Sequence, residues 1–225
     1  MTAKRRSAAA KEKTVLVTGF EPFGGASMNP SALAANALDG KLIGGRRVVG
    51  VVLPCVFGDA REALRRAMHS VKPELVLCVG EAGGRAELAL ERVAINVDDA
   101  RIADNGGAKP VDRAIVPRGP VGYWSTLPIK AIAAALQAEG IPAAVSQTAG
   151  TFVCNHVFYA LMHELRDQPG VRGGFVHIPF LPEQAATKPG VPSMELATIV
   201  RALELAIATA LRTRRDVRVS GGATH

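Results

Sequence analysis

The feature that most limits the fold of this chain is the alternation of short apolar runs with longer amphipathic segments. The apolar runs have the length and β-branched content of buried strands, and they occupy residues 14–18, 47–53, 74–79, 143–146 and 173–178. The amphipathic segments repeat their apolar residues at helical spacing, and they occupy residues 30–38, 59–69, 125–139, 152–165 and 193–211. This alternation predicts an α/β fold, in which helices cover both faces of a mostly parallel sheet.

The positive charge of the chain is confined to its two ends. Residues 1–13 hold five Lys or Arg and one Glu, and residues 212–225 hold four Arg and one Asp, so these ends account for the whole net charge of +7. We predict a disordered basic extension over 1–13, a single α/β domain over 14–211 and a flexible basic tail over 212–225. The neutral body argues against nucleic-acid binding. No apolar run approaches the ~20 residues of a membrane span, which argues against a membrane protein.

The cysteines indicate a reducing compartment. Cys55, Cys78 and Cys154 each lie in apolar sequence, with neither the spacing of a zinc site nor that of a disulfide framework. The N-terminal segment lacks the apolar stretch of a secretion signal. We therefore expect a cytoplasmic protein without a metal or other cofactor.

Cys154 is the candidate nucleophile. It falls in the first turn of the amphipathic segment at 152–165, directly after the small-residue turn at 148–151. Unpaired backbone N–H groups and the positive end of the helix dipole favour a thiolate at such a position. The competing interpretation is that Cys154 only packs, because free cysteine is among the most buried residue types.

His177 and Glu91 are the candidate partners of Cys154. His156 lies two residues further along the same helix and points about 200° away from the cysteine, whereas His177 ends a predicted strand. Glu91 stands among apolar neighbours, so its carboxylate needs a partner. One hypothesis is a structural ion pair with Arg85 or Arg92. The other is that Glu91 orients the imidazole of His177 in a Cys-His-acid arrangement.

Two glycine-rich loops follow predicted strands, where open α/β sheets bind ligands. The first, at 19–25, carries Phe20 and Phe23 and matches no nucleotide-binding pattern. Its phenylalanines either line an apolar pocket or pack into the end of the hydrophobic core. The second loop, at 80–85, includes Glu81. The long polar segment at 98–120 has no periodicity and is a candidate lid over the site.

Several longer motifs occur in a fixed order along the chain. They are GFEPFGG, AGGRAELALERVAIN, ARIADNGG, YWSTLPIKAI, GIPAAVSQTAGTFVCNHVFYALMH and GGFVHIPF. Together they make nearly the whole of residues 14–211 resemble the pyroglutamyl-peptidase I family, also called pyrrolidone-carboxylate peptidases. The resemblance implies a cytosolic thiol peptidase that removes an N-terminal pyroglutamyl residue from peptides. It also implies a three-layer α/β/α sandwich around a mostly parallel, mixed sheet, no required metal, and a homodimer or homotetramer.

The resemblance also implies roles for individual residues. The family's nucleophile, base and acid match Cys154, His177 and Glu91. The family's ring-flanking phenylalanines match Phe20 and Phe23, and its ARI segment beside the site matches Arg101 and Ile102.

Glu81 departs from the family pattern, because bacterial relatives commonly have Gln or an apolar residue there. Its oxygen could accept the lactam N–H, but its charge would oppose thiolate formation. We therefore expect Glu81→Gln to preserve or improve kcat/KM. Two other functions stay open at this point: a cysteine amidase acting on other small lactams or amides, and a non-catalytic ligand-binding domain.

Overall fold

The computed structural model describes residues 13–222. Its strands and helices alternate along the chain, as predicted, with a run of three short strands in the middle. They are β1 (Thr14–Phe20), α1 (Pro30–Leu38), β2 (Leu42–Ile43), β3 (Arg46–Leu53), α2 (Asp59–Val71), β4 (Leu75–Glu81), β5 (Leu88–Glu91), β6 (Val93–Ile95), β7 (Gly122–Trp124), α3 (Ile129–Ala138), β8 (Ala143–Ser146), α4 (Val153–Leu165), β9 (Arg172–Ile178), α5 (Pro182–Ala185) and α6 (Leu196–Arg212).

The main sheet has seven strands in the order β2-β3-β1-β4-β9-β5-β8. β1 lies parallel to β3 and β4, β4 lies parallel to β9, and β5 lies parallel to β8. Two pairs are antiparallel, β2 with β3 and β5 with β9. The prediction of a mostly parallel, mixed sheet is therefore confirmed. A second sheet contains only β6 and β7.

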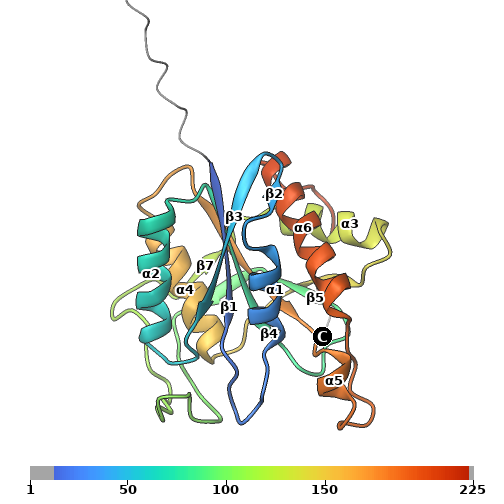
Figure 1. The fold of residues 1–225 in the computed structure, drawn as a ribbon. Coiled ribbons are helices and arrows are strands. Elements are labelled where there is room, and N and C mark those ends of the chain that lie inside the picture. The colour runs from blue at the N-terminus through green and yellow to red at the C-terminus, as the bar shows by residue number, and fades with distance from the viewer. Residues whose placement is uncertain (1–12, 223–225) are drawn as a thin grey trace, which may run out of the picture.

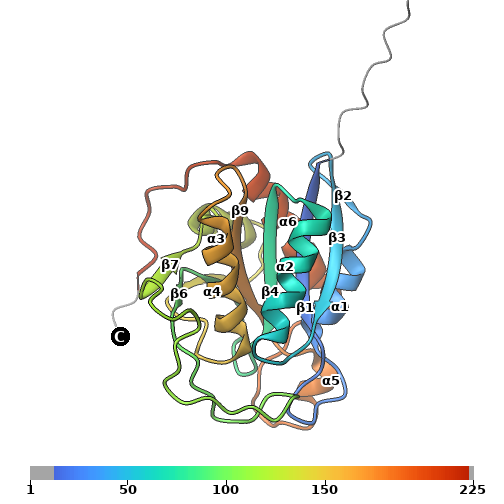
Figure 2. The same ribbon diagram turned by 90° about the vertical axis from the view of Figure 1, so that its left-hand side faces the viewer.

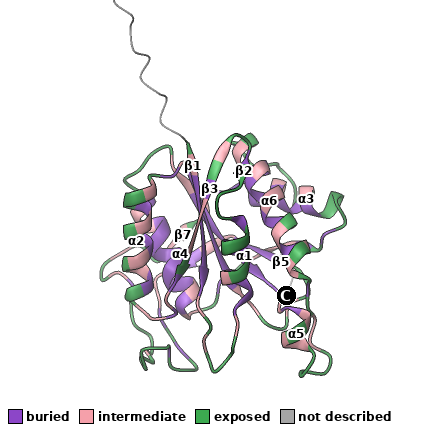
Figure 3. Ribbon diagram, in the orientation of Figure 1, coloured by how far each residue is buried: buried purple, intermediate pink, exposed green. Residues whose placement is uncertain are grey.

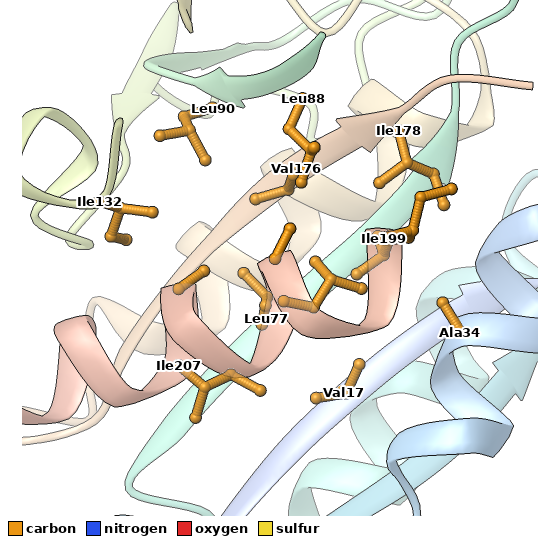
Figure 4. Close-up of a cluster of buried hydrophobic side chains, with 14 of the residues drawn as sticks. Val17, Ala34, Leu77, Leu88, Leu90, Ile132, Val176, Ile178, Ile199 and Ile207 are labelled. Atoms are coloured by element: carbon orange, nitrogen blue, oxygen red, sulfur yellow. The ribbon is translucent and has the colours of Figure 1, made fainter. Parts of the chain in front are cut away.

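Helices cover both faces of the main sheet and make three layers (Figures 1 and 2). α1, α3 and α6 pack on one face, where Val17, Leu77 and Val176 contact helix residues such as Ile199 and Ile207 (Figure 4). α2 and α4 pack on the other face, which presents a separate apolar cluster. Burial falls from the strands toward the outer sides of the helices (Figure 3). The strands are apolar along their length because both faces are covered.

Local signals explain several helix ends. The side chain of Asn29 caps α1 by accepting a hydrogen bond from the backbone N–H of Ser31, and Pro30 follows at the first helical position, as the sequence indicates. Gly140 follows α3 with φ +72°, a conformation that glycine adopts without steric cost. The predicted start of that helix at residue 125 is wrong. α3 begins only at Ile129, because Pro128 lies at the N-cap and residues 122–124 form β7.

The segment from residue 85 to 101 divides between the two sheets. β5 ends at Glu91 and pairs with β8 and β9, whereas β6 pairs with β7. The chain changes sheets at Arg92, where the apolar alternation of the sequence is interrupted. β5 thus brings the acidic candidate Glu91 into the main sheet.

A β-bridge and several hydrogen bonds hold the long polar loop after β6 in place against the rest of the domain. Asp98 and Arg113 pair as an isolated bridge, and Asp104 accepts a hydrogen bond from the backbone N–H of Phe57 (2.8 Å). Asn105 donates to Glu21 and to the carbonyl of Pro22, both at 2.9 Å. These contacts join the loop to the turn after β1 and to the chain after β3.

The segment after α6 lies along the domain as far as Gly222, while the rest of the C-terminus and residues 1–12 are outside the described part. We expected a flexible tail here. Asp216 accepts hydrogen bonds from the backbone N–H groups of Lys130 and Ala131, at 3.0 and 2.9 Å, and so caps α3. Arg92 donates to the carbonyl of Gly221 (2.6 Å). Within residues 13–222, no helix has the length and apolar character needed to cross a membrane.

Candidate active site

Side-chain alternation along three neighbouring strands places the candidate residues on one face of the sheet. In β4 and β9, Gly80 pairs with His177, and in β5 and β9, Glu91 pairs with Phe175. Phe175 belongs to the apolar cluster beneath α2 and α4, and paired residues share a face. Gly80, His177 and Glu91 therefore all face the side of the sheet on which α4 lies.

Cys154 approaches this group from the start of α4. The helix has Phe152 at its N-cap, so Cys154 is its second residue, as the sequence predicts. A methyl group on Gly80 would lie only 2.8 Å from Sγ of Cys154. The sulfur thus occupies the space above Gly80, whose strand neighbour is His177. Adjacent strands are ≈ 4.8 Å apart, so the nucleophile candidate and the imidazole are near neighbours.

His177 is held by Glu91 and Glu91 is held by Arg85. Nδ1 of His177 lies 2.7 Å from Oε1 of Glu91, and Nη1 of Arg85 lies 3.0 Å from the same oxygen. Glu91 is fully buried and His177 is 5% exposed. With Nδ1–H donating to the carboxylate, Nε2 carries the lone pair that can accept a proton. Glu91 therefore makes the ion pair with Arg85 and also binds the imidazole of His177.

The electrostatics at Cys154 oppose the thiolate expected from its helix position. Burial, followed by the charges of nearby groups that include Glu91 and Glu81, raises the pKa of the Cys154 thiol far above its usual range. The helix dipole acts in the other direction, but it supplies only about 1 kcal/mol. The resting site therefore holds a thiol, which needs a base to become a nucleophile.

Accessibility separates Cys154 from the other two cysteines. Burial likewise raises the pKa of both Cys55 and Cys78 to about 12, and both are buried in the core. Cys154 is partly accessible and lies beside an imidazole that can take its proton. Cys154 is therefore the most accessible of the three cysteines.

An open cleft of about 630 Å³ lies between the loops at the carboxyl ends of the strands. It is lined by Phe23, Gly24, Gly25, Ala26, Glu81, Gly83, Gly84, Ile102, Phe180, Gln184, Lys188 and Val191. Phe23 packs against Phe152, with ring centroids 5.9 Å apart, which links the cleft to the start of α4. Phe20 is only 2% exposed and packs against Phe175 in the core.

Glu81 lies on the opposite face of the sheet from Cys154. It follows Gly80 in β4, so its side chain alternates away from the sulfur and accepts a hydrogen bond from Nε2 of Gln184 (2.7 Å). Burial raises the pKa of Glu81. Arg101 is exposed and Ile102 lines the cleft nearby. The structure therefore brings Glu81, Phe23 and Ile102 together in the lining of the cleft, and Phe23 connects that lining to the start of α4 through Phe152.

His156 has a structural partner of its own. Its Nδ1 lies 2.9 Å from Asp98, and its Nε2 accepts a hydrogen bond from the backbone N–H of Gly58 (3.3 Å). This agrees with its exclusion as the partner of Cys154. Within residues 13–222 no group of His, Cys, Asp or Glu side chains could hold a metal ion.

Sequence reasoning missed two residues that help to position Cys154. Asn155 is fully buried, and its side chain accepts from the backbone N–H of Ile95 and donates to the carbonyls of Ile95 and Val97. Gly80 leaves the space that the sulfur fills. In the sequence, Asn155 shows only as an amide beside the cysteine, and Gly80 only as a glycine at the end of a strand. Neither pattern indicates which residues these two contact.

Comparisons with known proteins agree with this geometry. A family model described as pyroglutamyl peptidase matches residues 13–213. A pyrrolidone-carboxylate peptidase of Cupriavidus taiwanensis is 60% identical over 214 residues, which cover 94% of this chain and 99% of the relative. One of Escherichia fergusonii is 58% identical over 213 residues, which cover 95% of this chain and 100% of the relative.

Solved structures match over the same extent. Pyroglutamyl peptidase I from Bacillus amyloliquefaciens superimposes with a TM-score of 0.90 at 48% identity, covering 93% of this chain and 100% of that one. A mutant pyrrolidone carboxyl peptidase from Pyrococcus furiosus gives a TM-score of 0.86 at 45% identity, covering 88% and 98%. The extent and identity of these matches show that the chain belongs to the pyroglutamyl peptidase family.

Proposed function

We propose that this protein is a cysteine exopeptidase that removes an N-terminal pyroglutamyl residue from peptides. The observation that carries the proposal is the group formed by Cys154, His177 and Glu91 on one face of the sheet, beside a cleft. Family membership supports the reaction, and no comparison supports either alternative function.

The reaction begins with proton transfer, because burial holds Cys154 as a thiol at rest. Nε2 of His177 takes the thiol proton as the sulfur attacks the pyroglutamyl carbonyl carbon. The tetrahedral intermediate collapses, the C–N bond breaks, and the imidazolium gives its proton to the leaving amine. Water, deprotonated by His177, then attacks the thioester, releasing pyroglutamate and restoring the thiol. Glu91 stabilises the imidazolium in both halves of the reaction.

Backbone N–H groups at the start of α4 are the proposed oxyanion donors. The first hydrogen bond within the helix runs from His156 N–H to the carbonyl of Phe152 (3.1 Å). The N–H groups of the three residues before His156 therefore have no partner within the helix. Phe152 supplies no side-chain cap to them. These N–H groups, including that of Cys154, can stabilise the oxyanion that forms during attack.

The cleft beside Phe23 is the proposed binding place of the lactam ring. Phe23 and Ile102 offer apolar contact to an uncharged five-membered ring, and Glu81 offers a carboxylate oxygen at the same cleft. Phe20, assigned to the ring wall by family resemblance, would support the pocket from within the core. Arg101 is proposed to assist near the carbonyl.

A panel of chromogenic amides tests the function. We expect turnover of the pyroglutamyl amide and none of the prolyl or alanyl amides, and loss of that turnover with Cys154→Ser or iodoacetamide. Cys55→Ser, which changes a buried cysteine of the same cluster, is the matched control and should keep activity. Turnover that survives Cys154→Ser would overturn the assignment of the nucleophile. Turnover of all three amides would favour a broader amidase, and turnover of none would favour a binding domain.

We also propose a cytoplasmic homodimer or homotetramer. The need for a reduced Cys154 supports the location. Exposed apolar side chains, among them Trp124 (68% exposed) and Val121 (87% exposed), support self-association. Light scattering coupled to size-exclusion chromatography would measure the mass in solution, and a monomer at micromolar concentration would contradict the oligomer.

A further inference from the structure

Arg85 makes contacts that the catalytic scheme above does not use. Its Nη1 lies 3.0 Å from Oε1 of Glu91, the same oxygen that binds His177, and 3.3 Å from Oγ of Ser146. Its Nη2 lies 3.5 Å from the carbonyl of Thr148. The guanidinium therefore contacts the proposed acid and also the chain that leads from β8 to Cys154.

The carboxylate of Glu91 depends on this cation. Glu91 is fully buried, and within residues 13–222 its Oε2 has no hydrogen-bond partner. An ionised carboxylate in such a place is unstable unless a charge compensates it, and a neutral imidazole carries none. Arg85 supplies that charge while remaining 35% exposed. Without the guanidinium, the charge of the buried carboxylate would be uncompensated, and Glu91 would support an imidazolium at His177 less well.

Arg85 also fixes the spacing between acid and nucleophile. Glu91 and Ser146 are register partners in β5 and β8, and the chain turns from Ser146 into the loop before α4. One guanidinium that binds Glu91, Ser146 and Thr148 joins both sides of this turn. A planar group with several donors can do so, whereas the single ammonium of lysine cannot reproduce all three contacts.

We infer that Arg85 is a positioning residue for the proposed reaction, which compensates the buried charge of Glu91 and holds Glu91 in register with the Cys154 loop. This inference rests on the proposed roles of Glu91 and His177. Arg85 acts through Glu91 and not on the substrate, so its loss should lower kcat and leave KM nearly unchanged.

The test measures kcat and KM of Arg85→Ala on a pyroglutamyl amide. We expect kcat to fall about 30- to 100-fold with KM within about threefold. Millimolar methylguanidinium should raise the kcat of Arg85→Ala at least about fivefold, because Arg85 is partly exposed and lines an open surface depression together with Ser146. Arg92→Ala is the matched control. It removes the next cation along the chain, which contacts Gly221, and should show neither effect.

A double-mutant cycle separates this inference from the proposed function. If Arg85 acts through Glu91, Arg85→Ala combined with Glu91→Gln should be no slower than Glu91→Gln alone. Fully additive losses, a wild-type kcat in Arg85→Ala, or a loss in KM alone would overturn the role of Arg85 while leaving the proposed site intact. A wild-type kcat in Glu91→Gln would instead overturn the proposed site.

A folding defect would not leave the question open. If Arg85→Ala does not fold, Arg85→Lys becomes the deciding variant, because it keeps the charge and loses the planar geometry. An intermediate kcat with unchanged KM would then support the inference, and full activity would refute the need for a guanidinium.

Discussion

Gly80→Ala should disable the enzyme by displacing the sulfur of Cys154, the proposed nucleophile. The added methyl would lie 2.8 Å from Sγ of Cys154 and 2.8 Å from Cζ of Phe175. Ordinary contacts between such atoms are about 3.5–4.0 Å, so the sulfur must retreat by about 1 Å. A displacement of that size costs about 100-fold in rate. Crowding should also destabilise the fold by about 1–3 kcal/mol.

Gly173→Ala is the matched control for this prediction. Its methyl would lie 2.8 Å from Cδ1 of Leu165 and 3.0 Å from Cδ2 of Leu161, so it produces similar crowding on the same face of the sheet, far from the sulfur. Steady-state kinetics with a pyroglutamyl amide and thermal melting measure both variants. We expect comparable losses in melting temperature but a 100-fold loss in kcat/KM for Gly80→Ala only. Wild-type kcat/KM in Gly80→Ala, or equal losses in both variants, would refute the reasoning.

Three further predictions address electrostatics and the C-terminal segment. Because burial raises the pKa of Glu81, the folded state binds that proton more tightly than the unfolded state, and stability is lost as pH rises through the pKa. Glu81→Gln should therefore raise the melting temperature by about 1–3 °C at pH 7.5 but not at pH 4, with kcat/KM preserved or improved. A tenfold loss in kcat/KM would show a positive role for the carboxylate. Alkylation of Cys154 by iodoacetamide, followed by mass spectrometry, should still accelerate above pH 9, because burial raises the pKa of the thiol; a rate that is constant from pH 7 upward would contradict this. Asp216→Ala removes the cap of α3 and should cost about 0.5–2 kcal/mol of unfolding free energy with unchanged kcat/KM, whereas lost activity would link the tail to the site.

Much of the fold follows from local patterns. The strand at 14–18 and the helix that begins near Cys154 depend on residues close together in the chain. Composition and periodicity therefore predicted them. β2, β7 and α5 were missed, because each has four residues or fewer and leaves no periodic signal.

The site was predictable as a list of residues but not as an arrangement. The motifs named Glu91, Cys154 and His177, which stand far apart in the sequence. Their meeting depends on the pairing of β5 with β9, which is antiparallel in an otherwise mostly parallel sheet. Strand direction is decided by contacts between distant segments, and no local pattern encodes it.

The sequence by itself determined that this chain forms an α/β sheet with a cysteine at a helix start, because strand and helix signals act over a few residues. Only the tertiary structure decided the surroundings of that cysteine. The alternation of side chains along β4 directs Glu81 away from the sulfur of Cys154 and toward Gln184. The pairing of β4 with β9 places His177 beside Gly80 and the sulfur. The tertiary structure also brings Arg85 onto the buried carboxylate of Glu91. Burial and register, which set these contacts and the protonation of the thiol, exist only once distant segments have packed together.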